Sequence, residues 1–391
     1  MDELETLDDL RARHGPIFRR GPGVLYVGEP AEAKAVLADT GSRYREHSDF
    51  FQTGKGLFGP RSAQQEVGRA ARNLLRDHWT ARSDRLAAIV AREIGPDSRW
   101  PDAGNLLLYT CFRDVLVPEG ELRRLVDQVV RHAVLAGARE RRPVLLRAAL
   151  RYRVRRALVA ELSRRRTRDV RAPADLLDVL AAAAPDDSSR TALVRLAEVF
   201  LSFLFAVVGS TGFLLGWSVY LRATAPGAGG DLAGVVREAL RLRPVAWNFG
   251  RFPAEPHRLA GTEVTTSDEV VVCSYLVHRD SRFWPDADEF RPQRWSAGMP
   301  PGGAEAYIPF GWGTHTCVAA GFAVQVVEDV LGLLPPAGQW RVEARRHRPH
   351  VAAALAPPTF TLRTNGARTG EGGEHGQDHP RRTGGAQHPQ E

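Results

Sequence analysis

The sequence predicts a mainly α-helical protein with a small β-sheet subdomain. From about residue 66 to residue 215, apolar residues recur at helical spacing and are interrupted chiefly by Pro and Gly. Shorter segments at residues 16–28 and 269–280 are typical of strands. The chain has 391 residues, of which 43% are hydrophobic, and this is enough to bury a sizeable core in one large domain or two.

The N-terminal part opens the predicted sheet. Residues 16–28 (PIFRRGPGVLYVG) read as two short strands around a Gly-Pro-Gly turn. Residues 29–39 (EPAEAKAVLAD) follow as a helix, with Pro30 near its first turn. The densest basic stretch, residues 139–171, has apolar residues at helical spacing between its arginines. Two interpretations of that stretch stay open, a solvated amphipathic helix and a docking face for an acidic protein.

The most apolar segment lies in the middle of the chain, at residues 193–223. It contains Arg195, Glu198 and several small residues, so a buried central helix is favoured over a membrane span. A Gly-rich break and a short helix near residue 232 come next. From about residue 365 the chain lacks large apolar side chains, which predicts a disordered tail over residues 365–391.

Charge and cysteine content bear on the class of protein. The formal net charge is +7, but almost all basic residues are arginine, which is typical of a GC-rich genome and is weak evidence for nucleic-acid binding. Cys111, Cys273 and Cys317 are an odd and scattered set, which argues against a disulfide framework and for a reducing compartment. The N-terminus has no uncharged apolar run of about 18 residues. We therefore expect a soluble cytoplasmic protein that binds neither nucleic acid nor a membrane.

Short motifs follow one another between residues 237 and 317. Residues 237–244 (REALRLRP) place a Glu and an Arg three apart on one helical face. Residues 278–286 (HRDSRFWPD) lead into an aromatic-rich, Pro-punctuated coil that ends near residue 295. Residues 310–317 (FGWGTHTC) form a Gly-rich loop, as is needed where backbone passes close to another group. Cys317 ends this loop, directly before a helical run, and by itself could be only a small buried hydrophobe.

Taken in order, these motifs resemble the cytochrome P450 family of haem-thiolate monooxygenases, over roughly residues 15–364. The resemblance implies the cytochrome P450 fold in a single domain of residues 1–364. It also implies haem b (iron protoporphyrin IX) as the cofactor, with Cys317 as the axial ligand of the haem iron. The remaining residues that it implies are a buried structural triad of Glu238, Arg241 and Arg294, and a haem-binding loop with Phe310, Gly311, Gly313 and His315.

The chemistry of a thiolate ligand agrees with this position for Cys317. A cysteine thiolate on haem iron donates electron density that favours O–O cleavage. It must stay deprotonated, which requires a positive and hydrogen-bonding environment. Because Cys317 lies where a helix begins, we expect free N–H groups and the positive end of the helix dipole to point at it. Cys111 and Cys273 lie in apolar surroundings, and we expect both in the core.

Haem carries two propionates that need cationic partners. By resemblance these partners are Arg251, His315 and Arg72. Two positions depart from the family pattern. Gly68 stands four residues before Arg72, where the family usually has His or Trp, so we expect one propionate contact to be lost. Ala319 stands where the family usually has Gly, two residues after the cysteine, and we expect its methyl group to be tolerated.

The central helix departs from the pattern as well. The family carries an acid followed by Thr there, a catalytic pair that relays protons to dioxygen, whereas this chain has Ser210 and Thr211. Gly209 and Gly212 still allow the helix to open locally. Serine cannot act as a carboxylic acid near neutral pH. Protons then come from ordered water or a polar substrate group, or reducing power leaks as peroxide or the enzyme takes peroxide directly; an inert variant of the fold is a further alternative.

The expected substrate pocket is rich in aromatic residues: Phe50, Phe51, Phe205, Ala206, Gly209, Phe213, Trp247 and Phe249. Such walls suggest a bulky, aromatic substrate, and the composition suggests a bacterial secondary-metabolite pathway. The resemblance implies hydroxylation of such a natural-product intermediate, with dioxygen and with electrons from a ferredoxin and its ferredoxin reductase. Two alternatives stay open: oxidative coupling of aromatic groups, for example in a peptide substrate, without oxygen insertion, and a non-catalytic haem protein that binds or senses.

Overall fold

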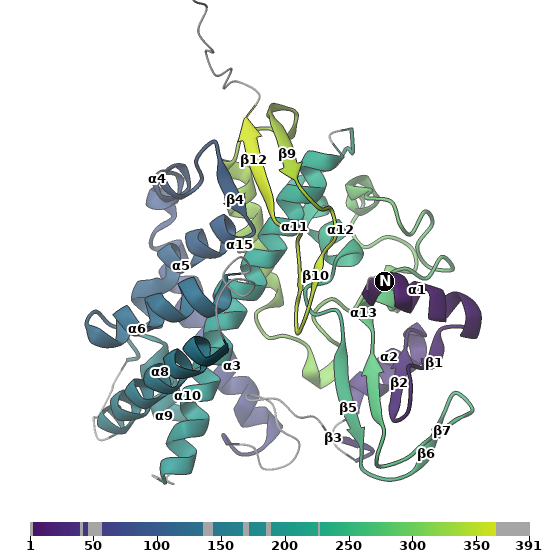
Figure 1. Ribbon diagram of the computed structural model, residues 1–391, viewed down its shortest axis with the longest axis horizontal. Coiled ribbons are helices and arrows are strands. Elements are labelled where there is room, and N and C mark those ends of the chain that lie inside the picture. The colour runs from purple at the N-terminus through teal and green to yellow at the C-terminus, as the bar shows by residue number, and fades with distance from the viewer. Residues whose placement is uncertain are drawn as a thin grey trace, which may run out of the picture.

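The computed structural model describes residues 3–39, 42–45, 57–135, 144–166, 172–184, 189–225 and 227–364. Figure 1 shows two parts side by side: a helical part, and a second part in which strands lie among short helices. Residues 365–391, for which the sequence predicts a disordered tail, and residues 50–51 of the expected pocket lie outside the described residues.

The helices confirm the mainly α-helical class. Several begin at a residue whose side chain caps the helix; Asp231, for example, accepts a hydrogen bond from the N–H of Gly234 at 2.7 Å. The α-helices are α1 Glu3–His14, α2 Pro30–Ala38, α3 Arg61–Thr80, α4 Ser83–Glu93, α5 Asp102–Leu116, α6 Glu121–Val129, α8 Val144–Arg165, α9 Leu176–Ala183, α10 Arg190–Leu204, α11 Thr211–Thr224, α12 Leu232–Leu242, α13 Ser274–Val277, α14 Gly303–Ala306 and α15 Ala320–Leu333. Helices of other types are η1 Val130–Val134, η2 Phe205–Ser210, η3 Pro292–Trp295, η4 Gly313–His315 and η5 Ala337–Gln339.

Within the described residues, the strands form one five-stranded sheet and three smaller ones. The largest sheet has the order β1-β2-β8-β5-β3, in which β2 and β8 pair in parallel and the other neighbours are antiparallel. The two strands predicted at residues 16–28 are its β1 and β2, so that prediction is confirmed. The strands are β1 Ile17–Arg19, β2 Val24–Val27, β3 Tyr44–Arg45, β4 Ser98–Trp100, β5 Phe249–Pro253, β6 His257–Leu259, β7 Thr262–Val264, β8 Glu269–Val272, β9 Trp340–Ala344, β10 His350–Val351, β11 Leu355–Ala356 and β12 Phe360–Thr364.

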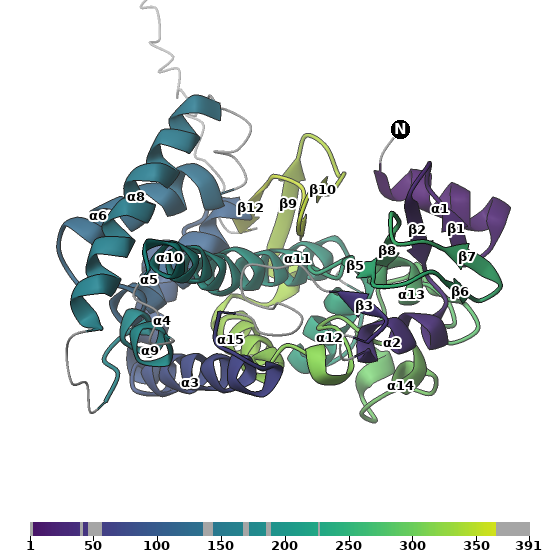
Figure 2. The ribbon, with the colours of Figure 1, turned by 90° about the horizontal axis from the view of Figure 1, so that it is seen from below.

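A long central helix, Arg190–Thr224, runs across the molecule from the helical part toward the strands (Figure 2). It is α10 and α11 joined end to end by η2, a π-helical segment over Phe205–Ser210. Its length and hydropathy would suit a membrane span, but 56% of its most apolar window is buried inside the fold. The prediction of a buried central helix is therefore confirmed.

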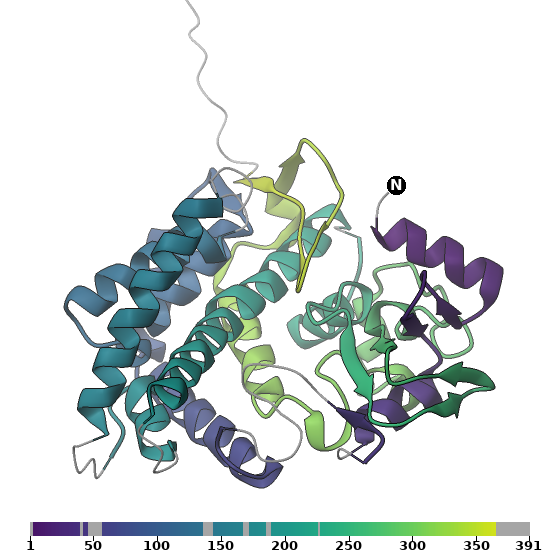
Figure 3. The same ribbon diagram turned by 60° about the horizontal axis from the view of Figure 1, so that its bottom comes forward.

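Other helices surround the central helix. α11 contacts α5, α12 and α15, and Figure 3 shows α15 lying beside the long helix and leading back to the loop that precedes it. The larger apolar core lies among these helices, and a second core lies between the five-stranded sheet, α2 and the coil before residue 310. Cys111 and Cys273 are buried, as predicted, and burial raises the pKa of both thiols to about 12.

Candidate active site

The loop of residues 310–317 is held in a tight, defined shape. The N–H of Cys317 donates to the carbonyl of Phe310 at 2.9 Å, which closes the loop. Gly311 and Gly313 have φ values of 79° and 66°, in the left-handed region that favours glycine. A Cβ on Gly313 would lie 3.1 Å from Cα of Ala38, so the loop also packs closely on α2.

Two polar side chains of α3 fasten this loop from outside. Arg61 donates to the carbonyl of Thr314 through Nη2 at 3.2 Å, and Gln65 donates to the same oxygen through Nε2 at 2.7 Å. The first turn of α3 is thereby joined to the middle of the loop. The sequence offered no signal for these contacts, because the two segments are far apart in the chain.

Cys317 receives one of the hydrogen bonds that a ligating thiolate needs, but the protein alone does not lower the pKa of its thiol. Its side chain is exposed, yet surrounding protein raises the pKa of its thiol through burial. The N–H of Ala319, just before α15, donates to the sulfur and opposes the rise in pKa. Ala319 has φ −102°, an ordinary value for a residue with a side chain, so the chain accommodates alanine there without backbone strain.

Cationic side chains lie within this loop and on two elements that contact it. Arg72 of α3 is half-buried, and its Nη1 donates to the carbonyl of Val318 at 3.2 Å. Arg251 is buried on β5, two residues after Phe249 and therefore on the same face of the strand. Phe249 touches the loop, since its ring lies 3.9 Å from where a Cβ on Gly311 would stand. His315 is half-buried within the loop itself.

These residues fit a haem group. A lone thiol that receives an N–H bond suits the iron. Guanidinium groups from α3 and β5 and the imidazole of His315 suit two carboxylates. Glycines at two turns of the loop keep side chains off its surface. Gly68, where the sequence departs from the family pattern, is buried on α3 one turn before Arg72.

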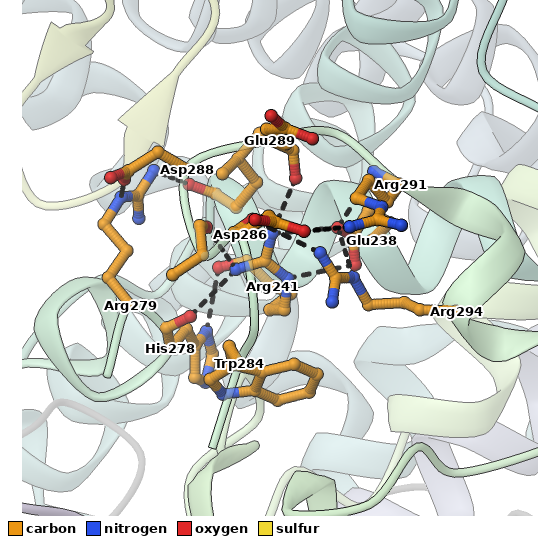
Figure 4. A network of polar contacts seen from close by, with 12 residues as sticks. Glu238, Arg241, His278, Arg279, Trp284, Asp286, Asp288, Glu289, Arg291 and Arg294 are labelled. Carbon is orange, nitrogen blue, oxygen red and sulfur yellow. Dashed lines mark hydrogen bonds and ion pairs between the residues drawn. The ribbon is translucent and has the colours of Figure 1, made fainter. Parts of the chain in front are cut away.

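The structure brings together the three residues of the expected triad (Figure 4). Glu238 and Arg241 on α12 are both fully buried, and Arg241 donates to the carboxylate through Nε at 3.0 Å and Nη2 at 2.8 Å. Arg294 of η3 donates to the same carboxylate through Nε at 3.0 Å. Arg241 also donates to the backbone carbonyls of His278, Ala287 and Glu289, and so ties the coil to α12.

Further donors complete the shell around Glu238. The backbone N–H of Arg291 donates to its carboxylate at 3.1 Å, and the indole N–H of Trp295 donates at 2.9 Å. A buried carboxylate is stable only when its charge and its lone pairs are satisfied, and here the donors come from α12, the coil and η3. Trp295 ends the aromatic-rich coil in the sequence, but its bond to Glu238 was not predicted.

His278 links this charged network to the segment before the loop. Its ring is fully buried; Nε2 accepts the N–H of Ile308 at 2.8 Å, and Nδ1 donates to the carbonyl of Arg241 at 3.2 Å. Burial, with Arg241 and Arg279 nearby, lowers the pKa of His278 to about 3. The neutral ring therefore connects α12 to the chain two residues ahead of Phe310.

Ser210 and Thr211 lie at the junction of the π segment with α11. The backbone N–H of Thr211 donates to the carbonyl of Ala206, five residues earlier, as π-helical pairing requires. The Thr211 hydroxyl donates to the same carbonyl at 3.1 Å. The sequence predicted a local opening of the helix here, and the π turn is such an opening.

The structure separates the expected pocket residues into two groups. Phe205, Ala206 and Phe249 keep accessible surface, whereas Gly209 is buried beneath the Phe205 ring. Phe213 and Trp247 require a correction: they are 2% and 5% exposed and belong to the main core. The indole N–H of Trp247 is bonded to the carbonyl of Ala352 at 2.8 Å, which turns that ring into the fold.

The chain is similar in sequence to known proteins. The family model of cytochrome P450 matches residues 232–334, which include α12, the coil and Cys317. The chain is 27% identical over 381 residues to cytochrome P450 135B1 of Mycobacterium tuberculosis, covering 84% of this chain and 79% of that protein. It is 29% identical over 217 residues to cyclooctatin synthase of Streptomyces melanosporofaciens, covering 47% and 46%.

Solved structures share the fold. HmtN, described as a post-tailoring hydroxylase involved in himastatin biosynthesis, has a TM-score of 0.70 at 19% identity, over 93% of this chain and 97% of that one. A mutant of P450 EryK in complex with erythromycin B has a TM-score of 0.69 at 21% identity, over 94% and 98%. The matched motif region, the relative over most of the chain and the shared fold agree: the chain is similar to the cytochrome P450 family of haem-thiolate oxidoreductases in sequence and has the fold of that family.

Proposed function

We propose that this cytochrome P450 monooxygenase hydroxylates a bulky, aromatic natural-product intermediate, using dioxygen and electrons from a ferredoxin and its ferredoxin reductase. The observation that carries the proposal is the combination of Cys317, in a loop flanked by cations, with a central helix opened into a π turn at Thr211. A cysteine thiolate suits oxygen activation, and the π turn carries hydroxyl groups of the kind that relay protons.

Residues in the loop and next to it have proposed roles in holding the cofactor. Haem, when bound, supplies the reduction of dioxygen and the transfer of one oxygen atom. Cys317 holds the iron, and the Ala319 N–H stabilises the negative charge of the thiolate. Arg72, Arg251 and His315 hold the propionates and so fix the orientation of the ring.

Protons pass through hydroxyl groups in this proposal. The Thr211 hydroxyl donates to the carbonyl of Ala206, so its oxygen can still accept a hydrogen bond from water or from a substrate group. Ser210 cannot supply an acidic proton near neutral pH, but a hydroxyl can accept one proton while donating another. Ordered water or a polar group of the substrate then completes the relay.

The substrate class rests on the accessible aromatic side chains and on the relatives. Phe205 and Phe249 offer ring faces and edges to an aromatic ligand, and Ala206 leaves room beside them. Proteins similar to this one are described as a hydroxylase of himastatin biosynthesis and as cyclooctatin synthase. We further propose that the enzyme works in the cytoplasm as one domain of residues 1–364, to which residues 365–391 add no catalytic group.

Turnover under labelled dioxygen tests the proposal. Aromatic natural products are first screened for a shift of the haem absorption band on binding, with Cys317→Ala protein as the control. A ligand that shifts the band is then turned over with a ferredoxin and its reductase under ¹⁸O₂. We expect a product that carries one labelled oxygen atom.

Other outcomes identify other reactions. A product that has lost two hydrogen atoms and carries no label would identify oxidative coupling. Failure to consume reductant with any ligand, together with an intact thiolate spectrum, would identify a binding or sensing protein.

A further inference from the structure

We propose that Asn105 of α5 is a positioning residue for Ser210 and Thr211, because its side-chain amide holds the central helix in the π form. The inference deepens the proposed oxygen-inserting function and rests on it for its chemical meaning. Its structural content, that one amide on a neighbouring helix maintains the π turn, can be tested separately.

Asn105 reaches the π segment directly. The side chain is 0% exposed, and its Nδ2 donates to the carbonyls of Val208 at 2.6 Å and Gly209 at 3.1 Å. Both carbonyls belong to η2, where the wider turn disturbs the regular ladder of backbone hydrogen bonds. Because both partners can only accept, the orientation of the amide is fixed.

The crossing of α5 and α11 is built around this side chain. A Cβ on Gly212 would lie 2.3 Å from Nδ2 and 2.9 Å from Cγ of Asn105, so the amide occupies the space that any larger residue would fill. On the opposite side, a Cβ on Gly104 would lie 3.4 Å from the carbonyl of Gly212 and 2.8 Å from the Trp100 ring. Glycine on both helices therefore permits the close approach that brings Asn105 within bonding distance.

The π form determines where the catalytic hydroxyls lie. Both the N–H and the hydroxyl of Thr211 meet the carbonyl of Ala206. In a regular α-helix the Thr211 N–H would pair instead with Val207, four residues earlier, and the Thr211 and Ser210 side chains would turn with the backbone. By holding Val208 and Gly209, Asn105 keeps that alternative from forming.

Asn105 is a poor choice for stability alone. Among the described residues its Oδ1 has no hydrogen-bond partner, and a buried unpaired carbonyl is unfavourable. An apolar side chain of the same size would avoid that penalty. What the amide adds is its two donated hydrogen bonds. A leucine could fill the same space but could not bond to the carbonyls of Val208 and Gly209.

A series of near-isosteric variants of the haem-loaded enzyme tests the proposal. The variants differ in how many hydrogen bonds the side chain at position 105 can donate. Asparagine donates two hydrogen bonds, Asn105→Asp donates one when protonated, and Asn105→Leu donates none. Gly212→Ala displaces the amide while keeping it chemically intact. Ser218→Ala is the matched control, because Ser218 is a buried residue of α11 whose hydroxyl bonds to Leu214, in the regular α-helix.

Two measurements report on the series, and neither needs a known substrate. The first is hydrogen–deuterium exchange of the backbone amides of residues 205–212. The second is the solvent deuterium isotope effect on dioxygen-dependent oxidation of reductant, with a ferredoxin and its reductase. We expect exchange to accelerate by about tenfold in Asn105→Leu, less in Asn105→Asp, and not in Ser218→Ala. The isotope effect should rise in the same order, while the reduced carbon monoxide spectrum stays that of the thiolate form.

The outcomes separate the two proposals. Unchanged exchange and an unchanged isotope effect in both Asn105→Leu and Gly212→Ala would overturn the positioning role. If Asn105→Leu does not fold, Asn105→Asp and Gly212→Ala decide by the same criteria. If the wild-type enzyme does not oxidise reductant under dioxygen with any ligand that shifts its haem band, the proposed function fails, and the exchange data still decide whether Asn105 maintains the π turn.

Discussion

The cysteine loop and the central helix are built by different means. The cysteine loop and the coil before it are held by charged side chains: Glu238 accepts hydrogen bonds from Arg241 and Arg294, and Arg72 donates to Val318, directly after Cys317. The π segment of the central helix has no charged residue between Phe205 and Ser210. Its shape depends on backbone pairing and on one neutral amide from another helix. A change of charge should therefore affect the first region, and a change of hydrogen-bond donor should affect the second.

The largest effect is expected at the ligand itself. Cys317→Ala removes the thiol while leaving the loop backbone, so the strongly red-shifted band of the reduced carbon monoxide complex should disappear completely. Cys111→Ala is the matched control, because Cys111 is buried away from the loop and should leave that band in place. A red-shifted band that persists in Cys317→Ala would place the ligand elsewhere in the chain.

The second effect tests the charged network. Glu238→Gln keeps the shape of the side chain but leaves Arg241 and Arg294 without their anion, and breaking a buried pair costs about 3–5 kcal/mol of unfolding free energy. Haem content should fall with it, because the coil before the loop loses its attachment. Glu198→Gln is the control, since its partner Arg151 is exposed, its partner Arg155 is only half-buried, and ion pairs near the surface contribute about 0–1 kcal/mol.

Denaturant titration and the haem-to-protein absorbance ratio measure both variants. Equal stability and equal haem content in Glu238→Gln and wild type would show that the network does not support the loop.

The third effect is a dependence of stability on pH through His278. Its pKa is about 3 when folded and 6.5 when unfolded, so its stabilising contribution is complete above pH 6.5 and is lost as the pH falls toward 3. At pH 5 the loss amounts to about 2 kcal/mol relative to pH 7. His278→Gln should remove this part of the slope of unfolding free energy against pH.

His350→Gln is the control for that slope, because it makes the same change of side chain at an exposed position. Parallel slopes for wild type and His278→Gln between pH 6.5 and pH 4 would contradict a neutral, buried imidazole at this position.

The smallest effect is expected at Ala319. The residue type there differs from the family pattern, but the backbone conformation is an ordinary one. Ala319→Gly adds freedom at a residue whose φ of −102° needs none, so stability should change by about 1 kcal/mol or less. The red-shifted band should be unchanged, because the N–H bonded to the sulfur is a backbone group. Loss of the band in Ala319→Gly would show that the methyl group helps to shape the loop.

Sequence reasoning succeeded where a pattern is local and failed where two distant segments meet. Glu238 and Arg241 share one helical face, and Arg294 follows at a family-typical position, so the triad could be predicted. Asn105 could not be, because no periodicity shows which helices cross or that a glycine on each lets them touch. Phe213 and Trp247 were misplaced because helical projection gives the direction of a side chain but not the elements packed against it.

The three-stranded sheet has a consequence for how the chain is made. β4, at Ser98–Trp100, lies at the edge of that sheet and its one neighbour there is β12, at Phe360–Thr364. During synthesis on the ribosome, β4 must therefore wait until almost all the described chain has been translated. Contacts between such distant segments form slowly, so β4 stays without its sheet neighbour for most of that time, and an unpaired strand is accessible to chaperones and to proteases.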